Sequence, residues 1–141
     1  MCSGYPLLLY NRIAANTLIP IHYNAANEAN GWGGRSNLWI SSLIGLALYI
    51  GFSVVQRYPK AINYPCKVTA ENADYLHKMG VKLIRHIKVF SMLLLAYGNY
   101  SAYAAAVMGK DADLSNFVMI PLMGGMFLSL IIYFGRMMVY K

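Results

Sequence analysis

The run LWISSLIGLALYIGFSVV at residues 38–55 decides the fold class, because it carries no charged residue and most of its side chains are apolar. A helix needs about 20 such residues to cross the hydrocarbon core of a bilayer. Two further charge-free runs, at 89–109 and 114–135, have similar lengths. None of the three alternates apolar and polar residues as a strand of a membrane barrel does. The chain is therefore predicted to be an all-α membrane protein with three transmembrane helices, at about 37–56, 87–108 and 116–136.

The composition of the whole chain agrees with this class. Of the 141 residues, 58% are hydrophobic and 12% are charged, whereas soluble domains carry about 25% charged residues. A soluble fold with three such helices would have too little polar chain to cover their apolar surfaces. We therefore expect residues 1–141 to form a single membrane domain whose main partner is the lipid bilayer.

The distribution of lysine and arginine predicts the orientation. Nine of these twelve residues lie within 57–88 or after residue 135, and three lie in the other polar segments. The positive-inside rule then places the 57–88 segment and the carboxyl terminus in the cytosol. The amino-terminal segment and the 110–116 loop are expected outside. This topology, together with attraction to anionic lipid headgroups, accounts for the net charge of +7, so we expect no nucleic-acid partner.

The outer segment before the first run is short and rich in turn-forming residues. Residues 18–23 contain β-type residues and one proline, which favours an extended stretch or an edge strand. Asn-Gly at 30–31 and Gly-Gly at 33–34 predict turns. One interpretation is a compact loop that Trp32 holds at the membrane interface, where indoles are favoured. The other is a recognition surface for an extracytoplasmic ligand, formed by His22, Asn24, Glu28 and Trp32.

The cytosolic segment is predicted to begin irregularly and then turn helical. Tyr-Pro pairs disfavour helix at Tyr58 and Tyr64. Thr69 is a suitable N-cap, and from Ala70 the chain can continue as one helix into the second run. The first turns of this helix are amphipathic, which favours contact with the inner headgroup layer; binding of a partner protein is the alternative. Its polar face contains Glu71, Asp74, Lys78, Lys82 and Arg85.

Inside the predicted spans, small residues indicate helix packing more than transport. Asn99 is the only amide deep in a span, whereas a conduction path needs several polar groups. Small side chains let neighbouring helices approach closely. The predicted helix-packing residues are Gly98, Ala102, Gly124 and Gly125.

No catalytic motif is found in the sequence. There is no His-Glu-x-x-His, Gly-x-Ser-x-Gly, phosphate-binding glycine loop or Cys-x-x-Cys. The three histidines fall on both sides of the predicted membrane, as do Cys2 and Cys66, so neither a metal site nor a disulfide is expected. We expect a protein that is not an enzyme and that has no cofactor.

Residues 19–40, IPIHYNAANEANGWGGRSNLWI, resemble the membrane family called domain of unknown function 1648. The hallmark of that family looks like I-P-x-H-F/Y-N-x-x-G-x-x-D-G-W/Y-G-x-K/R. Asn27 stands where the family usually has glycine, and Asn30 where it usually has an acidic residue. A second similar block spans residues 63–72, and the resemblance covers about residues 5–90. The motif residues that become candidates for facing a ligand are Pro20, His22, Asn24, Gly31, Trp32 and Gly33.

The resemblance implies both an additional helix and a function. Members of the family usually begin with a complete transmembrane helix, of which residues 5–13, YPLLLYNRI, look like the end. We therefore expect an upstream span to be missing; an outward-facing amino terminus without that span is the alternative. In SdpI-like proteins the domain is joined to a further membrane domain. Those proteins resemble immunity factors that protect a bacterium from a secreted toxin and can hold a transcriptional repressor at the membrane.

Two functions from different classes follow as expectations. The first is an immunity-like or signalling protein of the bacterial inner membrane, which meets an extracytoplasmic peptide through residues 19–35. The second is a structural or accessory subunit that contacts another membrane protein, or a second copy of itself, through its small-residue helix faces.

Overall fold

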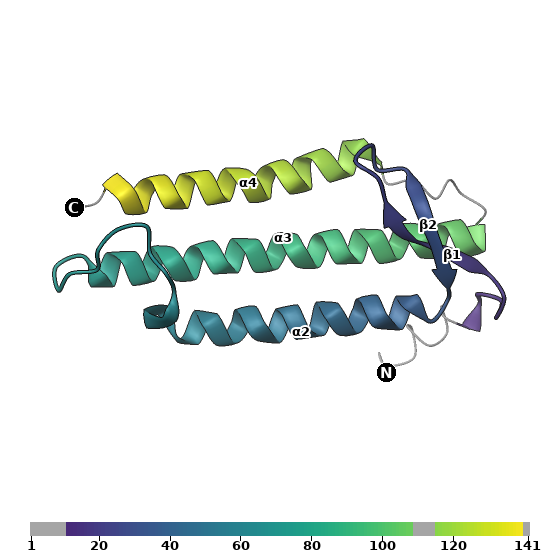
Figure 1. Cartoon of the computed structure of the whole chain (residues 1–141), viewed down its shortest axis with the longest axis horizontal. Coiled ribbons are helices and arrows are strands. Elements are labelled where there is room, and N and C mark those ends of the chain that lie inside the picture. Colours follow the sequence, from purple (N-terminus) through teal and green to yellow (C-terminus); the bar gives the residue numbers. More distant parts are fainter. Residues whose placement is uncertain (1–10, 109–114, 140–141) are drawn as a thin grey trace. The chain divides into compact units, whose positions relative to one another are not determined.

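The computed structural model describes residues 11–108 and 115–139 (Figure 1). The predictions made for residues 5–10, for Cys2 and for most of the 110–116 loop lie outside the described residues. The elements follow one another as β1 (Leu18–Tyr23), β2 (Ala29–Gly34), α2 (Asn37–Arg57), the 3-10 helix η1 (Pro59–Ala61), α3 (Ala73–Met108) and α4 (Asn116–Val139).

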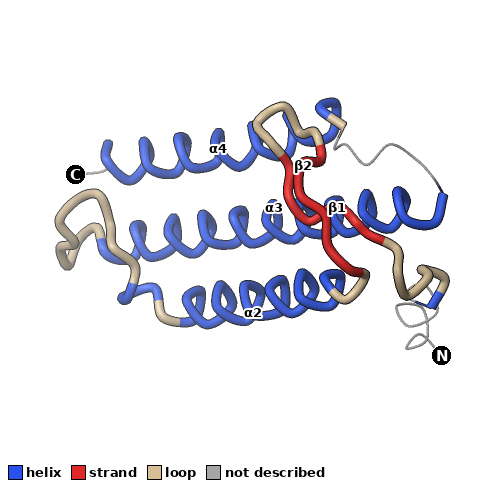
Figure 2. The backbone as a smooth tube through the Cα atoms, turned by 45° about the vertical axis from the view of Figure 1, so that its right-hand side comes forward, coloured by secondary structure: helices blue, strands red, loops and turns tan. Residues whose placement is uncertain are grey.

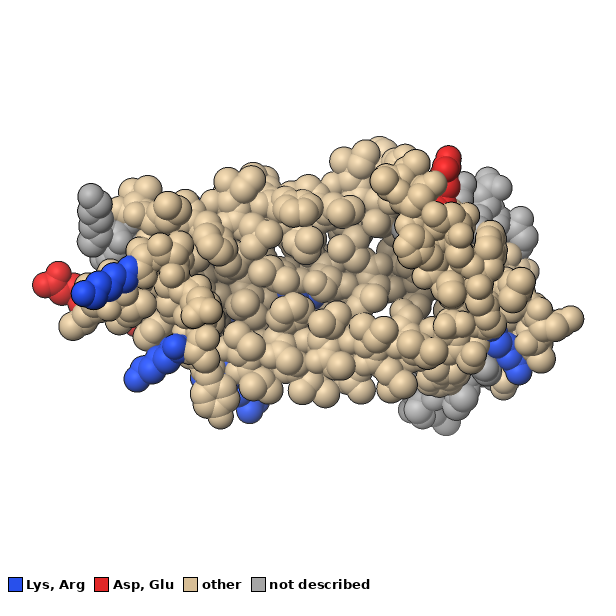
Figure 3. All heavy atoms as spheres, viewed as in Figure 1, with Lys and Arg blue, Asp and Glu red and all other residues tan. Residues whose placement is uncertain are grey.

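Three helices cover the three charge-free runs, as predicted. Of these, α2 and α4 are long and apolar enough to cross a membrane, and nothing in their most apolar stretches is buried. On the face drawn in Figure 3, the surface over the middle of α4 is accordingly tan; the charged residue of this helix, Arg136, lies in its last turn. Helix α3 does not meet the same criterion of length and composition. Its 87–108 part is less apolar, because it contains Asn99 and three tyrosines.

The helix boundaries in the polar segment follow from local chemistry. Helix α2 ends at Arg57 because Tyr58 precedes a proline and leaves the helical region, with φ −122° and ψ 65°. Thr69, the predicted N-cap of a helix from Ala70, instead closes the turn at 69–72 that precedes α3. Its Oγ1 accepts from the Asn72 backbone N–H at 3.4 Å, and its own N–H donates to Asn72 Oδ1 at 2.8 Å. This reciprocal pair resembles a capping box, and the regular helix begins at Ala73 instead of Ala70.

The prediction of an all-α chain is wrong in one respect, because β1 and β2 form a two-stranded antiparallel sheet (Figure 2, red). The predicted turns at 30–31 and 33–34 are wrong as well, since both pairs lie within β2. The chain instead turns between Asn24 and Glu28, where the Asn24 N–H donates to the Glu28 carbonyl at 2.9 Å. Two glycines of β2, Gly31 and Gly33, lie close to the side chains of His22 and Ile21 of β1.

Contacts divide the chain into two compact units, and each contains part of α2, α3 and α4. Unit 1, residues 1–43 and 95–119, includes the hairpin; its buried apolar residues are Ile13, Ile19, Ala102 and Ala104. Unit 2, residues 44–94 and 120–141, includes η1 and the following loop. The core of unit 2 is formed by Leu76, Met79, Leu83 and Met137.

Candidate functional site

The hairpin turn in unit 1 is held by one asparagine. Asn24 Oδ1 accepts from the backbone N–H groups of Ala26, at 2.9 Å, and Glu28, at 3.0 Å. Its Nδ2 donates to Glu28 Oε2 at 2.8 Å. A short polar side chain that satisfies local N–H groups is the usual way in which asparagine stabilises a turn. Asn24 is therefore occupied in shaping the turn, and only the exposed Glu28 carboxylate presents a charge there.

The turn contains one residue with a left-handed backbone. Asn27 has φ 65°, in the region that glycine and asparagine adopt most readily. Asparagine is therefore suited to this position of the turn. Asn27 Nδ2 donates to Asn116 Oδ1, which links the turn to the first residue of α4 within unit 1.

His22 and Gly31 determine how the two strands meet. They are direct partners in the sheet, and a Cβ added to Gly31 would lie 2.8 Å from His22 Cβ. Only glycine therefore fits opposite His22 without a shift of backbone. His22 Nδ1 and Asn30 Oδ1 form a hydrogen bond of 2.6 Å between two exposed side chains.

The other motif residues divide between anchoring and exposure. Pro20 is buried, and its partner across the sheet, Trp32, is 51% exposed. A Cβ at Gly33 would approach Asn37 Nδ2 to 2.7 Å, so this glycine lets the hairpin pack on the start of α2. The structure thus brings His22 and Asn30 together as exposed groups. Trp32 is exposed on the same strand as Asn30, opposite the buried Pro20.

The four predicted helix-packing residues have different surroundings. Ala102 is buried in unit 1. A Cβ at Gly125 would lie 2.7 Å from Phe90 Cζ, so Gly125 accommodates that ring in unit 2. Added Cβ atoms at Gly98 and Gly124 would meet nothing within 4 Å among the described residues. The backbone at Gly98 of α3 and at Gly124 of α4 is therefore not covered by other described residues.

Unit 2 contains a second feature, a loop packed against the beginning of α3. The Tyr64 hydroxyl donates to the Pro59 carbonyl at 2.8 Å, and its ring lies 5.7 Å from that of His77. A Cβ at Gly80 would lie 2.8 Å from Tyr64 Oη, so Gly80 forms the notch that seats this ring. Burial raises the pKa of the Tyr64 phenol above its ordinary value of 10.0. The neutral phenol therefore holds η1 in place beside α3.

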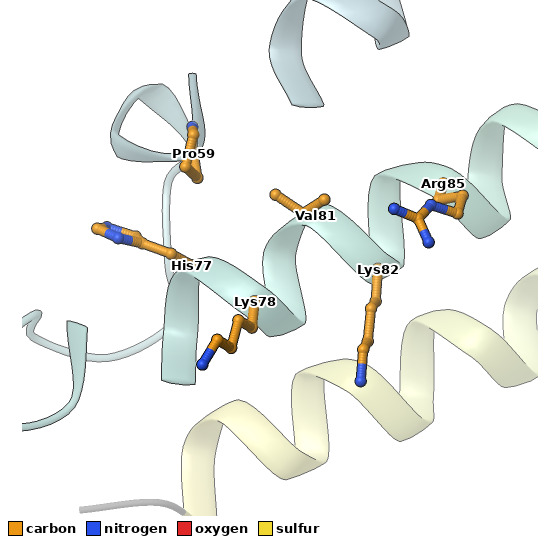
Figure 4. Close-up of a pocket in the computed structure, with 6 residues that line it drawn as sticks. All are labelled: Pro59, His77, Lys78, Val81, Lys82 and Arg85. Carbon is orange, nitrogen blue, oxygen red and sulfur yellow. The ribbon is translucent and has the colours of Figure 1, made fainter. Parts of the chain in front are cut away.

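This packing creates a groove of about 300 Å³ between η1 and α3 (Figure 4). The groove could not be predicted from the sequence, because Pro59 is held beside α3 by the hydrogen bond of Tyr64 and by the seating of its ring at Gly80. The spacing of the basic residues on α3 was the only available signal. We call this feature the basic groove; it is lined by Pro59, His77, Lys78, Val81, Lys82 and Arg85.

A polar cluster around Lys88 in unit 2 was also missed. Lys88 Nζ lies 3.2 Å from Ser53 Oγ and 3.5 Å from Gln56 Oε1, and 4.7 Å from the centre of the Tyr49 ring. A cation over an aromatic face is attracted by the ring quadrupole. No carboxylate in the described part of the chain is paired with Lys88. The cluster therefore holds a partly buried ammonium group with neutral partners alone.

Among the described residues, no group of three or more histidine, cysteine or carboxylate side chains could hold a metal ion. The hairpin and the basic groove present hydrogen-bonding and charged groups, which suits recognition. Comparison with protein-family models, curated proteins and solved structures finds no match to this chain.

Proposed function

We propose that the chain is an integral membrane protein of the bacterial inner membrane that recognises an extracytoplasmic ligand through its hairpin, in an immunity-like or signalling role. The observation that carries the membrane part of this proposal is the exposure of large apolar side chains along α2 and α4. Leu43 is 63% exposed, Phe117 87% and Ile131 70%. Burying each such side chain in an apolar medium is worth about 1.5–3 kcal/mol, and lipid supplies that medium.

The proposal includes a third span, the 87–108 part of α3. This part contains one charged residue, Lys88 at its edge, and an ammonium group near a span end can extend towards the headgroups. The contacts of Lys88 with Ser53, Gln56 and Tyr49 lower the cost of keeping its charge there. Three spans place the hairpin and the basic 57–88 segment on opposite sides, with the carboxyl terminus in the cytosol.

The ligand-recognition part of the proposal is supported by the geometry of the hairpin. Its exposed groups are fixed by hydrogen bonds: Asn30 holds the ring of His22, and Asn24 holds the turn. Groups fixed before binding lose less conformational entropy when a ligand arrives. Trp32 adds a large exposed aromatic surface of the kind that dominates binding energy at interfaces. The resemblance to domain of unknown function 1648 favours the same surface and stays a prediction.

The orientation is tested with two exposed alanines, each changed to cysteine in a cysteine-free background. Ala25 lies in the hairpin turn and Ala61 at the end of η1. We expect a membrane-impermeant maleimide to label residue 25 in intact cells, and residue 61 only after permeabilisation. Labelling of residue 61 in intact cells would contradict the proposed orientation, and labelling of both would contradict a span between them.

Ligand recognition is tested by survival of a sensitive bacterial strain in medium conditioned by a toxin-secreting bacterium. We expect protection by the unchanged chain, and its loss in His22→Ala and Trp32→Ala. Trp39→Ala is the matched control, because Trp39 is also exposed but lies in the first turn of α2. Equal loss in all three variants at equal protein levels would contradict recognition by the hairpin.

The accessory-subunit alternative is favoured by one observation, the open backbone patches at Gly98 and Gly124. Small residues at a lipid-facing position let a second helix approach closely. In that case Gly98→Leu and Gly124→Leu abolish co-purification of a partner membrane protein, whereas the hairpin variants retain it. Gly125→Leu is not informative here, because it would displace Phe90 within the chain itself.

A further inference from the structure

One face of α2 contacts the Lys88 ammonium group of α3 within unit 2. Tyr49, Ser53 and Gln56 lie four and three positions apart, so their side chains leave the same face of α2. Lys88 Nζ lies 3.2 Å from Ser53 Oγ and 4.7 Å from the centre of the Tyr49 ring. The Ser53 hydroxyl donates its own proton to the Tyr49 carbonyl at 2.6 Å, so its lone pairs face the ammonium group. These neutral groups hold the cation in place without compensating its charge.

The Gln56 side-chain amide adds one weak acceptor and one unpaired donor. Its Oε1 lies 3.5 Å from Lys88 Nζ, beyond the range of about 2.7–3.2 Å that is usual for an N–H···O hydrogen bond. Its Nε2 is buried and has no hydrogen-bond partner among the described residues. The opposite orientation of the amide would place Nε2 against the ammonium group, donor against donor. The cluster therefore keeps a buried donor that calls for an acceptor.

The charge of the cluster calls for the same kind of group. Lys88 is half-buried and is paired with no carboxylate in the described part of the chain. A partly buried charge is stabilised by an opposite charge that also satisfies its hydrogen bonds. Because Oε1 and Nε2 belong to one amide, the ammonium group that contacts Oε1 and the unpaired Nε2 donor lie close together. A negatively charged oxygen would accept hydrogen bonds from both.

The cluster is accessible and lies where such oxygens are found. Tyr49 is 50% exposed, and Ser53, Gln56 and Lys88 are partly exposed. Gln56 immediately precedes Arg57, the last residue of α2. In the proposed topology this is the cytosolic edge of the bilayer, where anionic headgroups accumulate near basic residues. A phospholipid headgroup and a free phosphate ion both present the required oxygen.

We propose that Lys88 and Gln56 form a binding site for one phosphate-type oxyanion, with one oxygen accepting from Lys88 Nζ and from Gln56 Nε2. Ser53 and Tyr49 hold the ammonium group against α2. The site differs from general attraction of anions to the basic 57–88 segment, because it requires a neutral donor as well as a cation. A phospholipid as the source of the oxyanion rests on the proposed membrane location, whereas the site itself does not.

The test uses the fact that Gln56 is the only glutamine in the chain. The full chain, ¹⁵N-labelled at the glutamine side-chain amide, is studied by NMR in a neutral detergent. The probes are a phosphatidylglycerol, a phosphatidylcholine with identical acyl chains, and inorganic phosphate. We expect the Gln56 amide resonances to shift with phosphatidylglycerol and to stay unchanged with phosphatidylcholine.

The probes also identify the source of the oxyanion. A shift with inorganic phosphate as well as phosphatidylglycerol would support the site with either source. A shift with inorganic phosphate alone would support it with the free ion as ligand. No shift with any probe would overturn the proposal. An equal shift with both lipids would also overturn it, because the acyl chains and not the charge would then be responsible.

Two lysine variants separate the site from general electrostatics. Lys88→Met removes the charge and keeps the approximate length of the side chain. It should weaken the binding of the oxyanion about tenfold or more, as the loss of a hydrogen bond to a charged group does. Lys82→Met is the matched control, because it removes an exposed lysine of the same helix, and it should leave the titration unchanged. Equal weakening in both variants would overturn the proposal.

A third variant keeps the proposal testable if Lys88→Met fails to fold. Gln56→Glu places a carboxylate where an amide oxygen lies 3.5 Å from Lys88 Nζ, so the chain itself supplies the oxyanion. Without added probe, we expect its melting temperature in detergent to exceed that of the unchanged chain. The probe that shifts the Gln56 resonances should raise the melting temperature of the unchanged chain and not that of Gln56→Glu. An equal rise in both proteins would contradict the site.

Failure of this proposal can be told apart from failure of the proposed function. If cysteine labelling confirms the span between residues 25 and 61 but the Gln56 resonances respond to no probe, the oxyanion site alone is wrong. If labelling shows no span and the resonances shift with inorganic phosphate, the membrane topology is wrong and the site stands, with a free phosphate ion as its ligand.

Discussion

The hairpin of unit 1 and the 58–72 segment of unit 2 are both polar segments beside an apolar helix, yet they are held differently. In the hairpin, most of the contacts are hydrogen bonds between residues close in sequence, such as those of Asn24 with Ala26 and Glu28. In the 58–72 segment, the ring of Tyr64 is seated in the notch at Gly80. The Cys66 thiol donates to the Met137 carbonyl at 3.3 Å, across 71 positions of the chain.

This difference indicates which of the two regions tolerates amino-acid substitutions better. A hairpin held by local hydrogen bonds can be formed by other turn-forming residues; Asn27 at φ 65°, for example, has a backbone that glycine also adopts. A loop held by packing depends on the shapes of residues that are distant in sequence, because dense interiors respond to single methyl groups. Both regions depend on a glycine that a side chain approaches closely: Gly31 within the hairpin, and Gly80 of α3 for the 58–72 segment.

The largest effect is expected from Gly31→Ala in the hairpin. Its Cβ would lie 2.8 Å from His22 Cβ, an atom next to the backbone that moves only if the strand moves. Such overpacking costs about 1–3 kcal/mol. Amide hydrogen exchange in β1 should therefore become faster. Gly34→Ala is the control, because its nearest neighbour, Ser36 Oγ, lies at 3.8 Å. Equal exchange in both variants would show that the close approach of His22 is unimportant.

A smaller effect is expected from Gly80→Ala, because the atoms that a new methyl group meets belong to the mobile end of Tyr64. The ring can move at the expense of its hydrogen bond to the Pro59 carbonyl, worth about 1 kcal/mol. The new methyl group also gains about 0.5–1 kcal/mol from helix propensity, so the melting temperature in detergent should fall only slightly. Gly98→Ala in the same helix meets no atom within 4 Å and should gain about 0.5–1 kcal/mol from helix propensity. A gain in both variants would contradict the seating of Tyr64 at Gly80.

The smallest effect concerns the ionisation of Tyr64. Burial raises the pKa of its phenol in the folded protein, so the unfolded chain loses this proton first as the pH rises. The stabilisation is fully present below the unfolded value of about 10 and is lost as the pH rises through the higher folded value. Tyr64→Phe should therefore reduce the fall of the melting temperature between pH 9 and pH 11. The exposed Tyr58 provides the control variant Tyr58→Phe, and an identical effect of both variants would refute this assignment.

Much of the helical fold was predictable because its determinants are local. Charge-free runs of sufficient length define α2 and α4, and the Tyr58-Pro59 pair sets the end of α2. Thr69 marks the turn that leads into α3, which begins at Ala73. The hairpin was predicted only in part. The extended stretch at 18–23 is confirmed as β1, but the glycines at 31 and 33 look like turn residues until the side chains of His22 and Ile21 are placed beside them.

The candidate sites divide in the same way. His22, Asn24 and Trp32 were found from residue types in one short segment, and the structure adds Asn30 as the partner of His22. The basic groove and the Lys88 cluster were not found, because their walls come from different elements. Pro59 lies beside α3 because of the fold of the 58–72 segment. Lys88 contacts Gln56 and Ser53, which precede it in the chain by 32 and 35 positions.

In this protein, hydropathy, charge and single-residue conformational preferences act over a few neighbouring positions. The linear order of residues was therefore enough to define the helices, the turn that leads into α3 and the basic character of the 57–88 segment. Strand register, the notch at Gly80 and the shape of the basic groove depend on van der Waals contacts between residues far apart in the chain. Such contacts have ranges of a few ångströms, and only the folded arrangement determines which atoms come that close.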